Sequence, residues 1–375
     1  MSASSRRRIA HLTSVHPRLD TRIFVKECRS LAAAGHEIFL VVADGLGDAQ
    51  REGVYILDAG RSQGRLDRML HASRRVIGQA RALEADVYHL HDPELLPFAL
   101  SLKRRGARVI FDAHEDLPLQ ILSKPYLAPR LRRPIAATAG ALEYFICKRL
   151  DAVIAATPSI RDSFSARGIP AIDVNNYPLL HELETAADWG GKKNEVCYVG
   201  GIAAIRGVKE VVAALPLCRE RVRLNLGGRF SDATLQAAVE LMSGWENVNA
   251  LGFLSRSQIR DVFGRSIAGL VTLHPTAAYI ESLPVKMFEY MSAGLPVIAS
   301  DFPLWREIVD THACGICVDP LNPASIADAI DTLASNPDAA KRMGQSGRQA
   351  VVRIFNWDAE NLKLQALYNR LLPSS

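Results

Sequence analysis

The amino-acid sequence predicts an α/β protein with two Rossmann-like domains, each built on a parallel sheet. Short apolar runs alternate with amphipathic helical segments through most of the 375 residues, which is typical of parallel strands covered by helices on both faces. The alternation stops at the polar stretch 185–194 and starts again at Val196. This length suits two domains of ordinary size.

The order of these runs gives the domain boundaries. We expect one domain at residues 1–180, a second at 181–355, and a closing helix at 356–375 that packs back toward the first domain. Strands are expected at 9–14, 37–43, 54–57, 87–91, 109–113, 152–156, 196–200, 222–226, 248–253, 269–273, 297–300 and 316–318. Helices are expected at 22–34, 65–84, 93–104, 158–167, 208–215, 232–242, 255–266, 284–293, 324–335 and 338–355.

Composition excludes several classes of protein. Apolar stretches are far shorter than a membrane span needs, and no convincing signal peptide precedes the first strand. The six cysteines are scattered, which favours free thiols in a reducing, cytoplasmic setting. Cys314 and Cys317 have the CxxC spacing of a redox pair or half a zinc site, but without a second CxxC we expect buried, inert thiols.

Positive charge is concentrated in the first half of the chain. Residues 1–180 hold 26 Lys and Arg against 19 Asp and Glu, whereas the remainder holds 19 against 21. This asymmetry favours an anionic partner such as lipid head groups, or it is a solvated basic face; no nucleic-acid motif appears. The segment 129–150 has basic residues around an apolar middle, so it either lies on an anionic membrane surface or is an ordinary helix with one buried face.

One segment, 277–300, carries the clearest chemistry. Pro284 starts its helix and Gly294 ends it, which places the helix N-terminus at the mouth of a strand, where a phosphate is stabilised. Lys286 lies in the first turn and adds a cation. Glu281 and Glu289 would repel a diphosphate, so we expect these carboxylates to bind neutral hydroxyl groups beside it.

One motif in this segment resembles the signature of glycosyltransferase family 4 (group 1): Glu281-x7-Glu289, followed by Tyr-Met-Ser-Ala-Gly-Leu-Pro-Val-Ile-Ala-Ser. The resemblance implies the GT-B fold, in which an acceptor-binding domain and a nucleotide-sugar-binding domain face a central cleft. It implies that Glu289 binds the nucleotide ribose and that Glu281 meets the donor sugar. The Pro-x-Lys-x-Phe-Glu-Tyr version is similar to the branch that builds bacterial surface polysaccharides.

A second loop supports this resemblance. The run from Tyr198 to Gly207 resembles the family's strand followed by Gly-Arg-x4-Lys-Gly, with Arg206 at the usual Lys position. Gly201 stands where the family commonly has Arg, so Arg206 is the expected cation for the diphosphate. The implied donor-binding residues are Arg206, Gly207, Ser282, Lys286 and Glu289.

The first half contributes weaker motifs. His114 follows the strand 109–113 and matches a family histidine that reaches the donor, so we expect it to act with Glu281 as a catalytic residue. His16 and Arg22 resemble the first loop and helix of this branch and are placed on the acceptor or phosphate side. A site role for His89 and His91 stays open.

The expected reaction is a retaining hexosyl transfer from a UDP- or GDP-sugar to a glycan or lipid-linked acceptor, without a cofactor. No Asp-x-Asp motif and no His/Cys cluster with ligand spacing appear, so no metal ion is expected. The alternatives are a GT-B sugar-nucleotide epimerase and a non-catalytic GT-B binding subunit. A Rossmann dehydrogenase is disfavoured, because no Gly-x-Gly-x-x-Gly follows the first strand. We expect a cytoplasmic protein, at the inner face of the membrane if the basic segment binds there.

Overall fold

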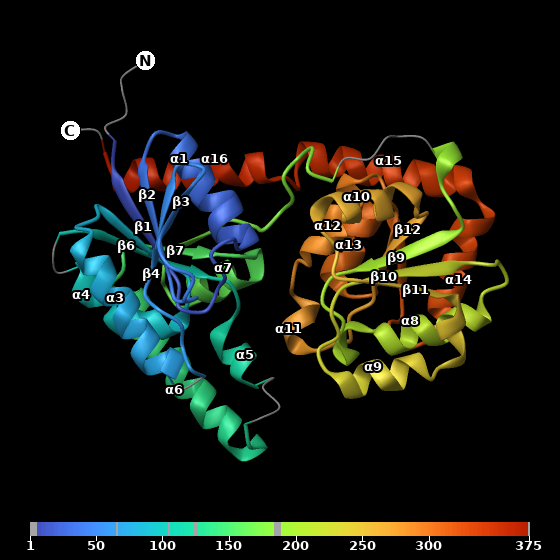
Figure 1. Ribbon diagram of the computed structural model, residues 1–375, viewed down its shortest axis with the longest axis horizontal. Helices are drawn as coiled ribbons and strands as arrows, with labels where there is room; N and C mark the ends of the chain where they lie inside the picture. The colour runs from blue at the N-terminus through green and yellow to red at the C-terminus, as the bar shows by residue number, and fades with distance from the viewer. Residues whose placement is uncertain (1–5, 65–66, 104–105, 123–126, 184–188, 374–375) are drawn as a thin grey trace. The chain divides into compact units, whose positions relative to one another are not determined.

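The computed structural model describes residues 6–64, 67–103, 106–122, 127–183 and 189–373. The chain divides into two compact units (Figure 1): the first comprises Met1–Asn176 with Glu360–Ser375, and the second comprises Tyr177–Ala359. Part of the predicted polar linker, residues 185–188, lies outside the described residues, and so do the predicted helix ends at 65–66 and 104. Each unit contains one sheet with helices on both faces, and this confirms the predicted α/β class.

The sheet of the first unit has the strand order β3-β4-β2-β1-β5-β6-β7-β8, and all neighbours are parallel except β3 and β4. Its strands are β1 (Arg8–Leu12), β2 (Glu37–Val42), β3 (Ala49–Arg51), β4 (Val54–Asp58), β5 (Val87–Leu90), β6 (Arg108–Ala113), β7 (Ala152–Ala155) and β8 (Ala171–Asp173). The sequence did not predict β3 or β8, because each has only three residues and neither has a buried residue to give an apolar pattern.

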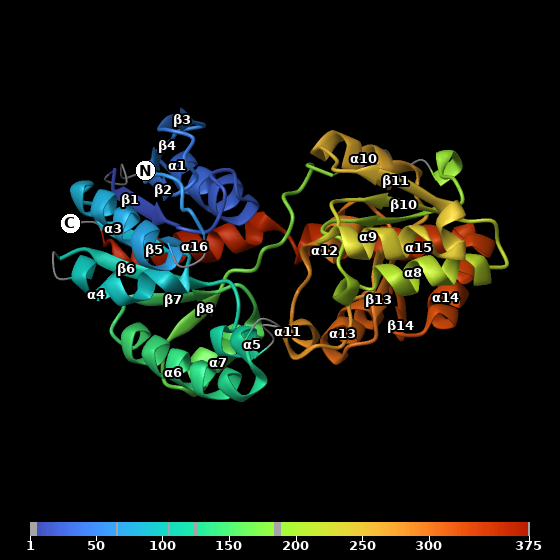
Figure 2. The ribbon, with the colours of Figure 1, turned by 60° about the horizontal axis from the view of Figure 1, so that its bottom comes forward.

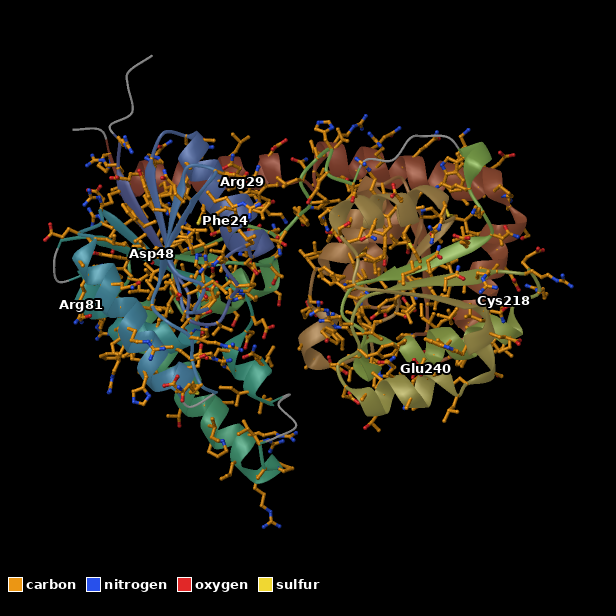
Figure 3. All side chains as sticks on the ribbon, viewed as in Figure 1. Phe24, Arg29, Asp48, Arg81, Cys218 and Glu240 are labelled. Carbon is orange, nitrogen blue, oxygen red and sulfur yellow. The ribbon has the colours of Figure 1, made fainter. Side chains whose placement is uncertain are left out.

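Helices cover both faces of this sheet (Figure 2). Apolar side chains of α3, α4, α6 and α7 pack on one face, and the π-helix η1, α1 and α16 belong to the other. Their bounds are η1 (Thr21–Cys28), α1 (Arg29–Ala33), α3 (Ser73–Ala82), α4 (Leu96–Lys103), α5 (Leu117–Leu122), α6 (Pro129–Cys147), α7 (Pro158–Ala166) and α16 (Trp357–Leu371). Phe24 on η1 is buried, whereas Arg81 on α3 is exposed (Figure 3).

The sheet of the second unit is entirely parallel and has the order β11-β10-β9-β12-β13-β14. Its strands are β9 (Glu195–Val199), β10 (Arg223–Gly227), β11 (Val248–Gly252), β12 (Ala268–Val271), β13 (Val297–Ser300) and β14 (Gly315–Val318). Its helices are α8 (Val208–Ala214), α9 (Ala233–Glu240), α10 (Arg256–Arg265), α11 (Ala277–Ile280), α12 (Val285–Ser292), α13 (Pro303–Thr311), α14 (Pro323–Ser335) and α15 (Pro337–Arg353).

Two apolar clusters form the core of this unit, one on each side of its sheet. One cluster contains side chains of α10, α12, α13 and α15, and the other contains side chains of α8, α9 and α14. All twelve predicted strands are present, whereas the sequence did not predict α13. Parallel strands end at one edge of a sheet, so the loops after β9 and β12 open at the same edge.

The cysteines are free thiols, as predicted. Burial raises the pKa of Cys314 to about 12 and the pKa of Cys317 to about 11, so both thiols are protonated and unreactive at neutral pH. Among the residues that the structure describes, none of the helices combines the length and apolar character that crossing a bilayer requires.

Candidate active site

The helix predicted to face a phosphate is α12, which follows β12 after a loop and the short helix α11. Pro284 was expected to be the first helical residue, but it lies at the N-cap with extended backbone, and the helix begins at Val285. The first N–H groups of a helix have no carbonyl of a preceding turn to bond, so those of Val285 and Lys286 are the donors at this end. The N-terminus of α12 is therefore still suited to binding an anion, because the N–H groups of Val285 and Lys286 are the donors there and Pro284 has none.

Lys286 occupies an unusual environment for an ammonium group. Its Nζ is buried, lies 3.6 Å from the centre of the Tyr198 ring, and has no hydrogen-bond partner among the described residues. Burial, followed by the nearby charge of Arg206, lowers the pKa of Lys286 to about 7. An anion beside Lys286 would stabilise the charged ammonium that its surroundings disfavour.

The loop after β9 brings Arg206 to this region. Its Nη1 lies 3.3 Å from the carbonyl oxygen of Gly201, to which it donates a hydrogen bond. Gly207 follows with a φ of 76°, and a Cβ at this position would lie 2.0 Å from the carbonyl oxygen of Thr272. Only glycine allows this close approach of the loop to the segment after β12. The role of Gly207 is therefore to position the loop that carries Arg206.

Glu289 is fixed by an arginine that the sequence did not identify. Arg256 Nη1 donates a hydrogen bond of 2.8 Å to Glu289 Oε1, and the same guanidinium binds Glu182 through two bonds of 2.7 Å. Arg256 is the first residue of α10, directly after the capping residue Ser255. The sequence motif does not identify Arg256, because this residue lies 33 positions before Glu289. One carboxylate oxygen of Glu289 is oriented by this bond.

Glu281 and Ser282 lie in the loop between α11 and α12. Glu281 follows the last residue of α11 and is exposed, so its carboxylate is accessible. The Ser282 hydroxyl donates to the carbonyl oxygen of Tyr279 at 2.9 Å, and its own carbonyl oxygen accepts a hydrogen bond of 2.7 Å from Trp305 Nε1. The buried Trp305 thus anchors this loop, and Ser282 contributes to its shape.

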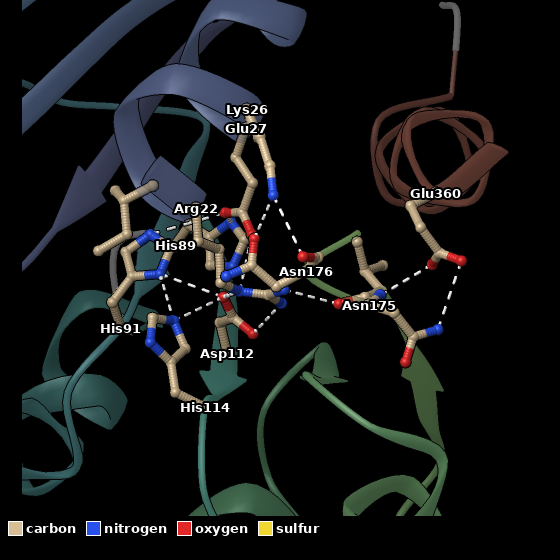
Figure 4. A network of polar contacts seen from close by, with 12 residues as sticks. Arg22, Lys26, Glu27, His89, His91, Asp112, His114, Asn175, Asn176 and Glu360 are labelled. Atoms are coloured by element: carbon tan, nitrogen blue, oxygen red, sulfur yellow. Dashed lines mark hydrogen bonds and ion pairs between the residues drawn. The ribbon is translucent and has the colours of Figure 1, made fainter. Parts of the chain in front are cut away.

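In the first unit, Asp112 is the centre of the contacts made by His114. Asp112 lies in the buried part of β6 and His114 directly follows the strand, and His114 Nε2 lies 2.9 Å from Asp112 Oδ2. Arg22 donates two hydrogen bonds, of 2.8 and 2.7 Å, to the same carboxylate (Figure 4). This bidentate contact with Arg22 opposes the effect of burial and holds the pKa of Asp112 well below its usual range. An ionised Asp112 orients the imidazole of His114.

Arg22 itself is not available to a ligand in this structure. Its side chain is 4% exposed, and it also donates a hydrogen bond of 2.7 Å to the carbonyl oxygen of Val174. The sequence predicts that Arg22 lies on the acceptor or phosphate side, from its position in the first helix. Because its donors are used on Asp112 and the backbone, the geometry makes Arg22 a residue that positions Asp112.

His16 lies beside His114, with the ring centres 4.9 Å apart. Its ring nitrogens lie 3.4 Å from an Asp20 carboxylate oxygen and 3.5 Å from Asp92 Oδ1. Although burial lowers the pKa of His16, the two carboxylates outweigh it and raise the pKa above its usual value. His16 and His114 therefore form a pair of half-buried imidazoles on the first unit, and the residues predicted to bind the donor all belong to the second.

Family models cover most of the chain. Residues 21–175 match the model described as Glycosyltransferase Family 4, and residues 182–350 match the model described as Glycosyl transferases group 1. The chain belongs to this glycosyltransferase family. The match extends over both units, so the resemblance inferred from the Glu281–Glu289 motif is confirmed.

The relatives include an enzyme named as a sugar-phosphate synthase and an enzyme named as a mannosyltransferase of phosphatidyl-myo-inositol. Alpha-maltose-1-phosphate synthase of Mycolicibacterium smegmatis is 26% identical over 339 residues, covering 82% of this chain and 85% of that protein. Phosphatidyl-myo-inositol mannosyltransferase of Mycobacterium leprae is 24% identical over 301 residues, covering 77% of this chain and 74% of that protein.

Solved structures show the same fold. Sucrose-phosphate synthase from Thermosynechococcus elongatus superposes with a TM-score of 0.80 and 20% identity, covering 99% of this chain and 100% of that one. Anabaena HepE in complex with UDP-glucose superposes with a TM-score of 0.73 and 14% identity, covering 97% of this chain and 100% of that one. The chain is therefore a glycosyltransferase of the GT-B class.

Proposed function

We propose that this glycosyltransferase moves a hexose, with retention of configuration, from a UDP- or GDP-sugar to a glycan or lipid-linked acceptor. The observation that carries the proposal is the buried ammonium of Lys286, which lies near Arg206 at the N-terminus of α12. Two cations and a helix N-terminus form a binding site for a diphosphate, whose charge they would stabilise as the sugar leaves. HepE, whose structure holds UDP-glucose, supports a nucleotide-sugar donor.

Hydroxyl recognition completes the proposed donor site. Arg256 holds one oxygen of Glu289 and leaves the other for a ribose hydroxyl, and the exposed Glu281 is accessible to hydroxyls of the sugar. We propose that the leaving diphosphate accepts the acceptor's proton on the same face, so no residue of the chain forms a covalent intermediate. Arg206 and Lys286 then supply the charge that a bridging metal ion provides in other transferases.

We further propose that His114, held by Asp112, binds the donor from the first unit, with His16 on the acceptor side. An acceptor bound to a lipid fits the exposed apolar side chains Leu131, Ile135, Leu142 and Phe145 of α6, and it fits the phosphatidyl-myo-inositol in the name of the Mycobacterium leprae relative. Such an acceptor suits a role in cell-surface polysaccharide synthesis. The enzyme would act in the cytoplasm, at the inner face of the membrane.

The donor site is tested with Glu289→Ala. We expect this change to abolish transfer from the preferred nucleotide sugar, because the ribose loses its carboxylate partner and Arg256 loses an acceptor. The matched control is Glu240→Ala, which removes an exposed carboxylate from α9 and should leave the rate unchanged (Figure 3). The donor is first identified by thermal shift with a panel of UDP- and GDP-sugars, since a specific ligand stabilises the folded protein.

Product analysis separates this proposal from its alternatives. We expect a glycosylated acceptor and free nucleoside diphosphate, formed at the same rate in EDTA. Conversion of the donor to an epimer without acceptor would show an epimerase, and binding of the donor without turnover would show a binding subunit. Loss of transfer in EDTA, restored by added metal ion, would refute the metal-free reaction.

A further inference from the structure

Three histidines and a glutamate meet inside the first unit. His11 comes from β1, Glu27 from η1, and His89 and His91 from β5 and the residue that follows it. Their exposures are 0%, 0%, 0% and 1%. β1 and β5 are neighbouring parallel strands with His11 opposite His89 in register, so both side chains project from the same face of the sheet.

The π-helix η1 brings Glu27 to this face. Its backbone hydrogen bonds join residues five apart, as in the bond of 3.1 Å from Val25 N–H to the carbonyl oxygen of Asp20. Side chains five positions apart therefore lie near one another on the same side of the helix. Arg22 and Glu27 have this spacing, and both are buried. Glu27 Oε1 lies 3.2 Å from Arg22 Nε in an ion pair, which leaves Oε2 directed at the histidines (Figure 4).

The distances around Glu27 Oε2 are nearly equal. It lies 3.8 Å from His11 Nδ1, 4.0 Å from His89 Nδ1 and 3.9 Å from His91 Nε2. These separations are too long for hydrogen bonds, and neither oxygen of Glu27 accepts a hydrogen bond from the described residues. Burial of a carboxylate without hydrogen bonds is costly.

The contacts of His91 suit a metal ligand. Neutral imidazoles offer a lone pair to a metal ion. His91 Nδ1 lies 3.2 Å from Asp112 Oδ2, so its proton faces a carboxylate and its Nε2 lone pair faces Glu27 and His11. A ligating histidine supported by a carboxylate is frequent in metal sites.

We propose that His11, Glu27, His89 and His91 bind one divalent transition-metal ion, with zinc as the preferred ion. Bonds of about 2.0–2.2 Å from two ligands to a shared ion place the ligand atoms roughly 3–4 Å apart, which matches the separations around Glu27. His11 Nδ1 and His91 Nε2 are closer, at 2.9 Å, and a ligand angle near a right angle accommodates them. Three imidazoles and a carboxylate suit zinc and its neighbours in the first transition row.

The ion would have a structural role. It would join β1, β5 and η1, and it would adjoin α16, because the Tyr368 hydroxyl lies 2.9 Å from His89 Nδ1. That hydroxyl would turn its hydrogen away and present its oxygen to the ion. The nearby group of His91, Asp112 and His114 has separations of 2.9–3.3 Å, which hydrogen bonds explain without an ion. The proposal concerns the first unit and does not depend on the donor chemistry proposed for the second.

Metal analysis of the purified full-length chain tests the proposal. After removal of any affinity tag, we expect about one zinc or related ion per chain by plasma mass spectrometry, retained during dialysis against EDTA because the ligands are buried. Glu27→Gln and His89→Gln should each lower this content at least about tenfold. The control His71→Gln removes a histidine whose side chain is 61% exposed and should leave the content unchanged.

A second measurement covers variants that fail to fold. The wild-type chain is unfolded in urea with a chelator and refolded with or without Zn²⁺ or Co²⁺. We expect refolding with metal to give a higher melting temperature, a stoichiometric ion after gel filtration, and for Co²⁺ the visible absorption of a nitrogen–oxygen site. Native protein that lacks transition metal, and that binds none during refolding, would overturn the proposal whatever its transfer activity.

Discussion

At the scale of single residues, Lys286 and Arg22 show two different uses of a buried cation. Arg22 is neutralised inside the protein by Asp112 and Glu27, so it stabilises neighbouring side chains. The Lys286 ammonium lies over the face of an aromatic ring and has no hydrogen-bond partner among the described residues, and its pKa falls to about 7. A cation–π contact offsets only part of the desolvation of an ammonium group. We therefore expect Lys286 to be charged fully only when an anion binds.

This lysine gives donor binding a distinct pH dependence. In the free protein its pKa is about 7, so above pH 7 the donor must bind together with a proton. Affinity for the diphosphate should then fall as pH rises from 7 to 9, by up to about tenfold per pH unit. Titration calorimetry with UDP-glucose or GDP-mannose, in buffers of different ionisation enthalpy, measures both the affinity and the proton uptake.

The variant Lys286→Met serves as the control for this effect. We expect weaker donor binding, with a flat profile over the same pH range and no linked proton, because methionine cannot be protonated. An affinity of the wild-type protein that is constant between pH 7 and 9 would show that Lys286 does not bind the diphosphate.

At the scale of elements, α6 has an apolar stripe that the fold leaves exposed. Leu131, Ile135, Leu142 and Phe145 are exposed at spacings of four, seven and three residues, which places them on one face of the helix. Ala136, Ile146 and Cys147 of the same helix are buried, and basic residues flank both ends of the helix. The sequence is compatible with a membrane-surface helix and with an ordinary surface helix, and from this stripe we propose that α6 contacts the membrane surface.

We predict that Phe145→Glu weakens binding of the protein to vesicles that contain anionic lipid. The change places a negative charge in the stripe, so it removes apolar contact and opposes the lipid charge. Co-sedimentation with phosphatidylglycerol vesicles should show at least about a threefold loss, with greater retention at low salt for the wild type. Ala137→Glu adds the same charge to an exposed position off the stripe and should have a smaller effect. Equal binding by all three proteins would exclude α6 as the contact.

At the scale of the whole molecule, α16 follows the second unit along the chain but belongs to the first. Glu360 Oε2 accepts a hydrogen bond of 2.8 Å from Asn175 N–H, and the Tyr368 hydroxyl bonds His89. Leu364 and Leu367 are buried on the same helix. The first unit is therefore completed only after the second has been synthesised.

This arrangement predicts which unit a change in α16 destabilises. Leu364→Ala should lower the stability of the first unit by about 2–5 kcal/mol, since it removes a fully buried side chain. Hydrogen exchange should become faster in β1 and β5, while β9 and β12 stay protected. Leu362→Ala changes a leucine that is 68% exposed and should leave both units unaffected. Faster exchange in the second unit instead would contradict the assignment of α16.

The sequence determined the features that depend on local pattern. Alternating apolar runs located all but two of the strands, and the motif from Glu281 to Glu289 identified the family, because residues close in sequence define a helix and the loop before it. The same reasoning predicted an ordinary helix at 22–34, whereas the structure has the π-helix η1 at its start. Whether a helix contains a π-helical turn depends on the buried residues that it contacts, and the spacing of apolar residues in the sequence hardly changes.

Only the tertiary structure decided which distant residues meet. Arg256 reaches Glu289 across 33 positions, and Arg22 reaches Asp112 across 90. Parallel strands bring segments from far apart to neighbouring positions, so His11 lies opposite His89 although 78 positions separate them. Ligand spacing along the sequence does not indicate the proposed metal site for this reason. Register and burial, which follow from the assembled sheet, place these side chains together.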